Sequence, residues 1–230
     1  MPARTIAIGD VHGCDVALQM LLGRLALTAD DTLVLLGDVV DRGPNSRRCV
    51  ELLIDLRRRC EVVLVLGNHE EMMLRVLRGV GSPAFWLPFG GRETLSSYGG
   101  DPGDVPETHL EFLESGVAYH ETATDIFVHA AIDPDVPLPQ QSVAALRWQR
   151  FYGCEPPHVS GKRVVCGHTP QTSGRPAVWS GWVCLDTLAY GGGWLTALDA
   201  TADATADAIW QSRQNGEVRG PLPLAVSPGQ

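Results

Sequence analysis

Polar side chains of metal-ligand type follow three apolar runs of the chain. TIAIGDVHG (residues 5–13) presents Asp10 and His12, LVLLGDVVDRG (33–43) presents Asp38 and Asp41, and VVLVLGNHE (62–70) presents Asn68 and His69. In each motif a glycine separates the apolar run from the first polar side chain, as expected where a buried strand ends in a turn. We therefore expect one metal site at the edge of a β-sheet.

Two later histidines extend this set. DIFVHAA (125–131) places His129 after an apolar run, and RVVCGHTP (163–170) does the same for His168. The candidate metal ligands are then Asp10, His12, Asp38, Asn68, His129 and His168. Mixed oxygen and nitrogen ligands suit Mn, Fe, Co or Zn, and we expect Mn. Six ligands are too many for one open catalytic ion, so they fit two ions that share a carboxylate.

Two adjacent divalent ions favour phosphoryl transfer. Together they clamp the attacking and leaving oxygens, and a water between them would lose a proton and become the nucleophile. Arg42, which directly follows Asp41, can donate two hydrogen bonds to phosphate oxygens. His69 is the candidate general acid, and Asp41 could orient it and raise its pKa, which would keep it protonated.

Alternating apolar runs and helical patterns position these residues. Helices are expected within 14–27, 44–59 and 69–78, which implies an α/β core with largely parallel strand pairing at its start. Residues 79–120 are rich in Gly and Pro and are expected to form a lid, with the aromatic residues of 85–89 packed under it. GWVCLDT (181–187) and WLTALDA (194–200) are predicted to form a two-stranded meander. We expect a single domain over 1–230 with a frayed tail from about 216.

Composition narrows the functional classes. The chain has 230 residues, of which 44% are hydrophobic, and a formal net charge of −9. An acidic balance argues against a nucleic-acid-binding surface and hence against a nuclease. The chain contains no long apolar run, its N-terminus enters the first strand without room for a signal peptide, and its six cysteines form no CxxC pair. We expect a cytoplasmic protein with reduced thiols and no membrane partner; no pattern specifies its oligomeric state.

GDVHG, GDVVDRG and GNHE, in this order and followed by VHA and GHTP, resemble the motifs of the phosphoprotein phosphatase family of metallophosphoesterases. Over about residues 4–200 the chain is similar to short bacterial serine/threonine phosphatases. The resemblance implies a four-layer α/β sandwich of two mixed sheets flanked by helices. It also implies that Asp10 and His12 bind the first ion, that Asp38 bridges both ions, and that Asn68, His129 and His168 complete the second site. His69 would be the acid, paired with Asp41, while Arg42 and Arg150 would bind phosphate.

The resemblance leaves the substrate open between two classes. A metal-dependent phosphomonoesterase acting on phosphoserine and phosphothreonine is the main expectation, and a symmetrical dinucleotide tetraphosphate hydrolase, similar in GDVHGC and GNH, is the alternative. Asp41 favours the phosphatase, because those hydrolases tend to lack Asp there and to have Asp after GNH, where this chain has Glu70. A catalytically inactive binding protein would lack ligands, and none is missing.

Three positions depart from the resembled motifs. Ala131 stands where the fourth motif usually has Gly, Leu66 stands where some members have Arg, and Leu188 stands where similar proteins tend to have Gly. Because none of these changes removes a ligand, we expect an active enzyme.

Overall fold

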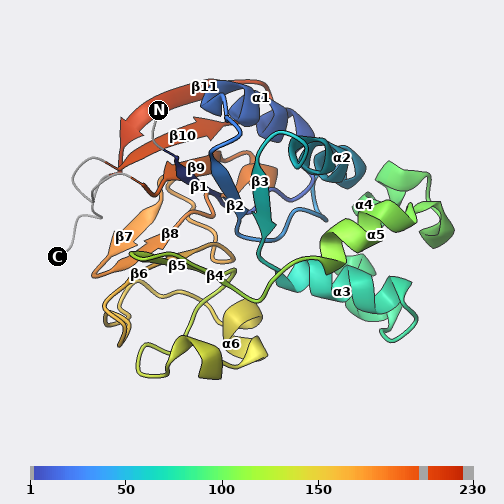
Figure 1. Cartoon of the computed structure of the whole chain (residues 1–230). Helices are drawn as coiled ribbons and strands as arrows, with labels where there is room; N and C mark the ends of the chain where they lie inside the picture. The colour runs from blue at the N-terminus through green and yellow to red at the C-terminus, as the bar shows by residue number, and fades with distance from the viewer. Residues whose placement is uncertain (1–2, 202–206, 225–230) are drawn as a thin grey trace.

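The computed structural model describes residues 3–201 and 207–224, and its strands form two mixed β-sheets (Figure 1). The six-stranded sheet has the order β11 (Val218–Pro223), β10 (Ala208–Ser212), β9 (Leu195–Asp199), β1 (Thr5–Ile8), β2 (Thr32–Leu35), β3 (Glu61–Leu64). The five-stranded sheet has the order β4 (His120–Glu121), β5 (Asp125–Phe127), β6 (Arg163–Cys166), β8 (Trp182–Cys184), β7 (Ala177–Trp179).

Helices flank both sheets. They are α1 (Asp15–Leu25), α2 (Ser46–Leu56), α3 (Asn68–Leu77), α4 (Gly91–Tyr98), α5 (Glu107–Glu114) and α6 (Val143–Trp148). Short 3-10 helices η1 (Pro83–Phe85), η2 (Leu87–Phe89), η3 (Pro102–Asp104), η4 (Leu138–Gln140) and η5 (Ala189–Gly191) lie in the connections. Figure 1 shows α1–α5 on the side of the six-stranded sheet and α6 beyond the other sheet. The expected α/β fold of two mixed sheets flanked by helices is confirmed.

The alternation of side chains along the strands builds the layers. In β1, Ile6 and Ile8 pack in the core beneath the helices, while Ala7 between them faces the core shared by the two sheets. In β6, Val165 enters that same shared core, whereas Val164 packs in a third core beneath α6. Because successive side chains of a strand point to opposite faces, each sheet is covered on both sides. This double burial explains the nearly continuous apolar runs in the sequence.

Within each sheet, parallel pairing brings the predicted ligand motifs to one edge. β1 pairs in parallel with β2, and β2 with β3, while β5 pairs in parallel with β6 in the second sheet. The carboxyl ends of neighbouring parallel strands lie at the same sheet edge, where such folds place their ligands. The expected helices and the parallel start of the fold are confirmed.

Two expectations for the C-terminal part are corrected. The segments around 182–184 and 195–199 do not form a meander, because β8 pairs with β6 and β7 in one sheet while β9 pairs with β1 and β10 in the other. Within the predicted frayed tail, residues 218–223 instead form β11, which pairs with β10; residues 225–230 lie outside the described part of the chain. The single-domain and lid assignments stay predictions.

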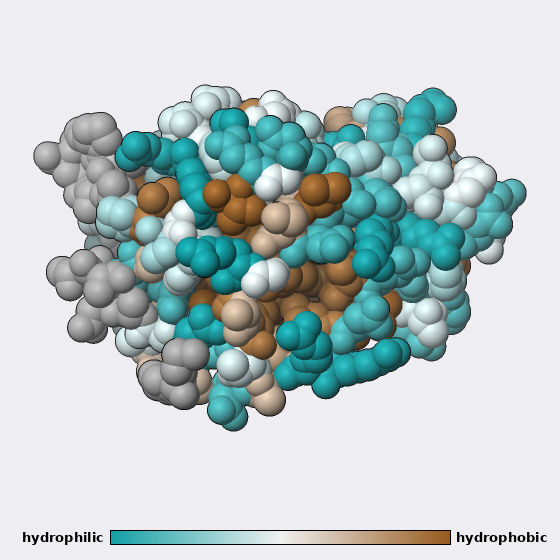
Figure 2. Space-filling model, turned by 90° about the horizontal axis from the view of Figure 1, so that it is seen from above, coloured by the Kyte–Doolittle hydropathy of each residue, from teal (hydrophilic) through white to brown (hydrophobic). Residues whose placement is uncertain are grey.

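The face of the molecule seen in Figure 2 is mainly polar. On the face shown in Figure 2 most residues are hydrophilic, and hydrophobic side chains gather in a partly recessed patch near its centre. All six cysteines are free thiols, and five of them are buried. Among the described residues, no helix combines the length and the apolar character that a membrane crossing requires.

An ion pair near the N-terminus gives a testable contribution to stability. Asp31, which is 2% exposed, accepts hydrogen bonds from Arg4 Nη2 at 2.7 Å and from the Thr28 amide at 2.8 Å. The Arg4 guanidinium holds the pKa of Asp31 well below its usual range. A depressed folded-state pKa stabilises the fold above the unfolded pKa, and this stabilisation is lost as the pH falls toward the folded value.

We expect Asp31→Asn to lower the free energy of unfolding at pH 7 by about 2 kcal/mol. The difference from the unchanged chain should shrink steadily as the pH falls below about 4. Urea unfolding at pH 7 and pH 3 measures both values, with the exposed neighbour Asp30→Asn as the control. An equal loss of stability at the two pH values would show that the charge of Asp31 is not the cause.

Candidate metal centre

Turns after five strands carry the predicted ligands. Asp10 and His12 follow β1, Asp38 follows β2, Asn68 begins α3 after β3, His129 follows β5 and His168 follows β6. The turns approach one another so closely that side chains would not fit at their glycines. A Cβ at Gly67 would overlap Asp38 Oδ1, and a Cβ at Gly167 would overlap Asp10 Oδ1. The glycines of the GN and GH motifs therefore make room for the next ligand.

Two groups of side chains could each hold a metal ion: His12 with Asp38 and His69, and Asp38 with His129 and His168. Asp38 belongs to both groups. Its Oδ2 lies 3.5 Å from His12 Nε2, and its other oxygen, Oδ1, lies 3.5 Å from His129 Nε2. One carboxylate that directs its two oxygens toward two sets of imidazoles has the arrangement that a bridging ligand requires.

Backbone contacts leave one nitrogen of each inner histidine available. His12 Nδ1 lies 3.0 Å from the Val40 carbonyl, and His129 Nδ1 lies 2.7 Å from the Leu36 carbonyl. Each Nδ1–H donates to its carbonyl, so each Nε2 keeps its lone pair for a metal. Burial lowers the pKa of both histidines well below the usual value, which keeps them neutral. These donors fit divalent ions.

The second group includes the predicted amide ligand. Asn68 Oδ1 lies 3.0 Å from His129 Nε2 and 3.1 Å from His168 Nδ1. The three atoms converge on one point, as expected of ligands to one ion.

Asp10 lies beside this centre but outside both groups. Its two oxygens accept the backbone N–H of His168 at 3.0 and 3.1 Å, and Oδ2 is 3.9 Å from His12 Nε2. Burial, together with the nearby carboxylates of Asp186 and Asp38, raises the pKa of Asp10 well above its usual value. A cation between these carboxylates would relieve this repulsion. The role of Asp10 as a metal ligand stays a prediction.

The structure corrects the expected protonation of His69. His69 Nδ1 lies 2.7 Å from Asp41 Oδ2, the expected pairing, but burial lowers the pKa of His69 to about 3, and the nearby Arg42 adds to this effect. Burial also raises the pKa of Asp41 to about 7. Arg42 Nη2 donates to His69 Nε2 over 3.0 Å, so His69 is neutral with its proton on Nδ1. The cost of burying a charge outweighs the contact with Asp41.

Glu70 is a positioning residue that was not predicted. It is fully buried, and its Oε2 accepts the amide N–H groups of Gly67 at 3.0 Å and Asp38 at 2.8 Å. Its Oε1 accepts the amides of Val39 at 2.7 Å and Val40 at 3.3 Å. Glu70 thereby holds the turn after β2 against the start of α3. Its position in the sequence could have predicted this role, because Glu three residues after a helix-capping residue commonly accepts hydrogen bonds from free backbone amides.

Several site residues have strained backbones. Non-glycine residues with φ in the left-handed region include His12, Asp38, Asp41, Arg42 and His168. Such conformations concentrate at functional sites, because the surrounding structure must enforce them.

Among the departures from the resembled motifs, Leu188 has φ of 61°, a conformation that favours glycine. Ala131 is different, because its φ is not positive. Its backbone amide donates to the Ala145 carbonyl at 3.3 Å. Alanine therefore causes no backbone strain at position 131.

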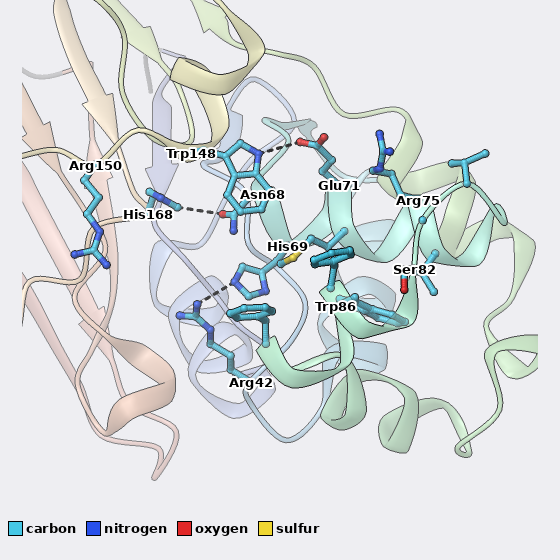
Figure 3. A pocket seen from close by; sticks show the side chains of 16 residues that line it. Arg42, Asn68, His69, Glu71, Arg75, Ser82, Trp86, Trp148, Arg150 and His168 are labelled. Atoms are coloured by element: carbon cyan, nitrogen blue, oxygen red, sulfur yellow. Dashed lines mark hydrogen bonds between the residues drawn. The ribbon is translucent and has the colours of Figure 1, made fainter.

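A cavity of about 780 Å³ opens beside the metal centre (Figure 3). Asn68, His69 and His168 lie at its inner end, and Figure 3 shows Arg75 and Arg150 on opposite sides of them. Three aromatic side chains on its wall are exposed: Phe85 (74%), Phe89 (54%) and Trp148 (46%).

The three aromatic residues of 85–89 all line the cavity but differ in burial. Trp86 is fully buried and donates from Nε1 to Asp41, which agrees with the expected packing, whereas Phe85 and Phe89 are exposed on the cavity wall. Leu66 is not among the lining residues. It lies against Gly116, where a Cβ would be 2.6 Å from Leu66 Cγ.

Two mixed sheets with paired ligand groups at their common edge define a class, the metal-dependent phosphoesterases. The calcineurin-like phosphoesterase family matches residues 3–195, and the chain belongs to this family. Solved structures agree on the fold. A candidate diadenosine tetraphosphatase has a TM-score of 0.65 at 22% identity, covering 95% of this chain and 94% of its own. A Saccharomyces cerevisiae serine/threonine phosphatase similar to human PP5 has a TM-score of 0.65 at 15% identity, covering 92% and 80%.

Curated relatives correct the expected activity. A symmetrical bis(5'-nucleosyl)-tetraphosphatase of Neisseria meningitidis is 30% identical over 174 residues, 75% of this chain and 57% of its own length. One of Cellvibrio japonicus is 37% identical over 133 residues, 56% of this chain and 46% of its own length. The chain thus spans about half the length of these relatives. The phosphoprotein phosphatase assignment is wrong, and the comparisons support the alternative better. Asp41 did not discriminate between the two substrate classes; its side chain is buried and contacts His69, Trp86 and Thr94.

Proposed function

We propose that this chain hydrolyses the central anhydride of a dinucleoside tetraphosphate with two divalent metal ions. The cavity beside the metal centre carries this proposal, because its wall combines metal-centre residues, three arginines and exposed aromatic side chains. A nucleoside polyphosphate has the matching form, with an anionic chain attached to a flat base. The names of the relatives support the same substrate class.

The charge distribution favours a polyanion. The chain carries 27 Asp and Glu against 18 Lys and Arg, yet Arg42, Arg75 and Arg150 gather around one cavity. Within residues 3–201 and 207–224, the side chains of Arg75 and Arg150 form no hydrogen bond or ion pair. Unpaired guanidinium groups in an acidic chain are available for phosphate oxygens, which they bind with paired hydrogen bonds.

The reaction is balanced by one water. Its oxygen adds to one inner phosphorus atom, the central P–O–P bridge breaks, and two nucleoside diphosphates result. The proposed ligands are Asp10, His12, Asp38, Asn68, His129 and His168. When bound, the two ions would supply Lewis acidity and lower the pKa of a water; manganese is the proposed metal.

Arg42, Arg75 and Arg150 would bind the phosphate chain, and His69 would protonate the leaving oxygen. His69 is neutral in the structure, with Arg42 on its Nε2. A bound tetraphosphate would engage Arg42 and place negative charge beside His69. Both changes raise the pKa of His69 and favour the protonated form that an acid needs. A cytoplasmic location stays a prediction.

Product analysis tests the proposal. The protein is treated with chelator, Mn²⁺ is restored, and diadenosine tetraphosphate is added. ADP should be the sole nucleotide product, and it should form only after Mn²⁺ is restored. Release of AMP and ATP would contradict central cleavage, and equal rates before and after Mn²⁺ would contradict the metal requirement.

A further inference from the structure

A second cavity lies on the other side of Arg42. It has a volume of about 430 Å³ and is lined by Arg42, Leu87, Pro88, Phe89, Gly90, Arg92, Glu93 and Tyr190. Arg42 and Phe89 also line the larger cavity, so the two cavities adjoin. Both volumes lie in the range of small-molecule sites.

The second cavity also approaches the metal centre, through Tyr190. The ring of Tyr190, 37% exposed, has its centroid 5.0 Å from that of His12, and the Arg42 guanidinium carbon lies 4.7 Å from the centroid of the same ring. The larger cavity is lined by His69 from one candidate metal group and by His168 from the other. Both cavities therefore adjoin the metal centre, and Arg42 lies at the boundary between them.

The second cavity contains the same two kinds of group as the first. Phe89 and Tyr190 offer exposed aromatic rings, and Arg92 is an exposed cation. In the part of the chain that the structure describes, the Arg92 side chain has no hydrogen-bond or ion-pair partner. An aromatic face and a free guanidinium suit a nucleoside diphosphate.

We propose that the two halves of the substrate bind in different cavities, one in the larger cavity with Arg75 and the other in the smaller cavity with Arg92. This inference rests on the proposed function. Cleavage at the centre of a symmetrical molecule requires that centre to lie at the metal ions. Arg42 lines both cavities, so a substrate whose central phosphates lie at Arg42 can place one half in each cavity. Arg42, at the boundary, would contact the central phosphates.

Steady-state kinetics with diadenosine tetraphosphate and Mn²⁺ test the inference. Arg92→Ala and Arg75→Ala should each raise KM about tenfold, with the effect mainly on KM rather than kcat. Because both halves are bound at once, the double variant should raise KM about a hundredfold. Arg92→Lys should recover part of the loss. Arg59→Ala, which removes an exposed arginine outside both cavities, is the control for net charge.

The outcomes separate the two proposals. If the unchanged protein releases ADP but Arg92→Ala behaves like Arg59→Ala, the proposed function stands and the two-cavity inference is overturned. If the unchanged protein releases no ADP, both are overturned. Melting temperature and bound manganese are measured for every variant, and a variant that differs in either is replaced by Arg92→Gln or Arg75→Gln.

Discussion

Asp38→Asn is expected to reduce hydrolysis of diadenosine tetraphosphate by at least 10³-fold and to remove most of the bound metal. Asp38 is the one carboxylate shared by both candidate metal groups, and its two oxygens face His12 and His129, each at 3.5 Å. An amide keeps the shape but loses the charge and one acceptor oxygen. Both ions would then lose a ligand at once, which explains the large effect.

The same substitution should not destabilise the metal-free chain. Burial and the neighbouring Glu70 raise the pKa of Asp38 well above its usual value, so an ionised Asp38 is unfavourable without a cation. After chelator treatment, the melting temperature of Asp38→Asn should be equal to or higher than that of the unchanged chain. Added Mn²⁺ should raise the melting temperature of the unchanged chain but not that of Asp38→Asn. Elemental analysis and thermal melting measure the two effects, with the exposed Asp135→Asn as control. Retention of two ions per chain would contradict the bridging role of Asp38.

His69→Asn should slow hydrolysis by about 10²- to 10⁴-fold, the usual contribution of a general acid. His69 is 1% exposed, contacts Asp41 through Nδ1 and directs Nε2 toward Arg42 and the cavity. Asparagine keeps a polar group there but cannot donate the proton. Metal content should change little, because the six predicted ligands remain and His69 Nε2 is already engaged by Arg42.

The pH dependence of the reaction distinguishes an acid from a merely structural residue. With diadenosine tetraphosphate, kcat of the unchanged protein should fall as the pH rises through the pKa of the acid in the substrate complex. The residual kcat of His69→Asn should lack that fall. The same pH profile in both proteins would show that His69 does not act as the acid. His120→Asn, on β4 and outside the metal centre, is the matched control.

The positions of the metal-centre residues were predictable because their pattern is local. An apolar run followed by Gly and a ligand-type residue indicates where a buried strand ends. Parallel pairing brings the ends of neighbouring strands together. Asp38 and Asn68 follow β2 and β3 for this reason, and the packing of the second sheet against the first brings His129 after β5 to the same place. The role of Glu70 was less apparent, since its four amide contacts depend on a turn that only tertiary packing creates.

Sheet membership near the C-terminus was not predictable from local pattern. β8 and β9 have the alternation and the glycine-rich connection of a hairpin, but a connection of ten residues also allows a change of sheet. The packing of Trp182 beneath α6 and of Leu198 in the shared core decides between the two arrangements. The protonation state of His69 was mispredicted for a similar reason: the sequence shows Asp41 as a partner but not the burial that opposes a charge.

Substrate choice was mispredicted because it was inferred from the wrong residues. Asp41 and Glu70 support the metal centre through buried contacts, and such contacts serve any phosphoryl substrate. The proposed function instead assigns substrate discrimination to the cavity walls, which include Phe85, Phe89 and Arg75.

The most direct test compares two substrates on one preparation restored with Mn²⁺. kcat/KM is measured for diadenosine tetraphosphate and for a phosphoserine peptide under identical conditions. We expect the dinucleotide to be hydrolysed with a kcat/KM at least 10²-fold higher, with two ADP formed for each molecule consumed. A higher kcat/KM for the peptide, or formation of AMP and ATP from the dinucleotide, would contradict the proposed activity.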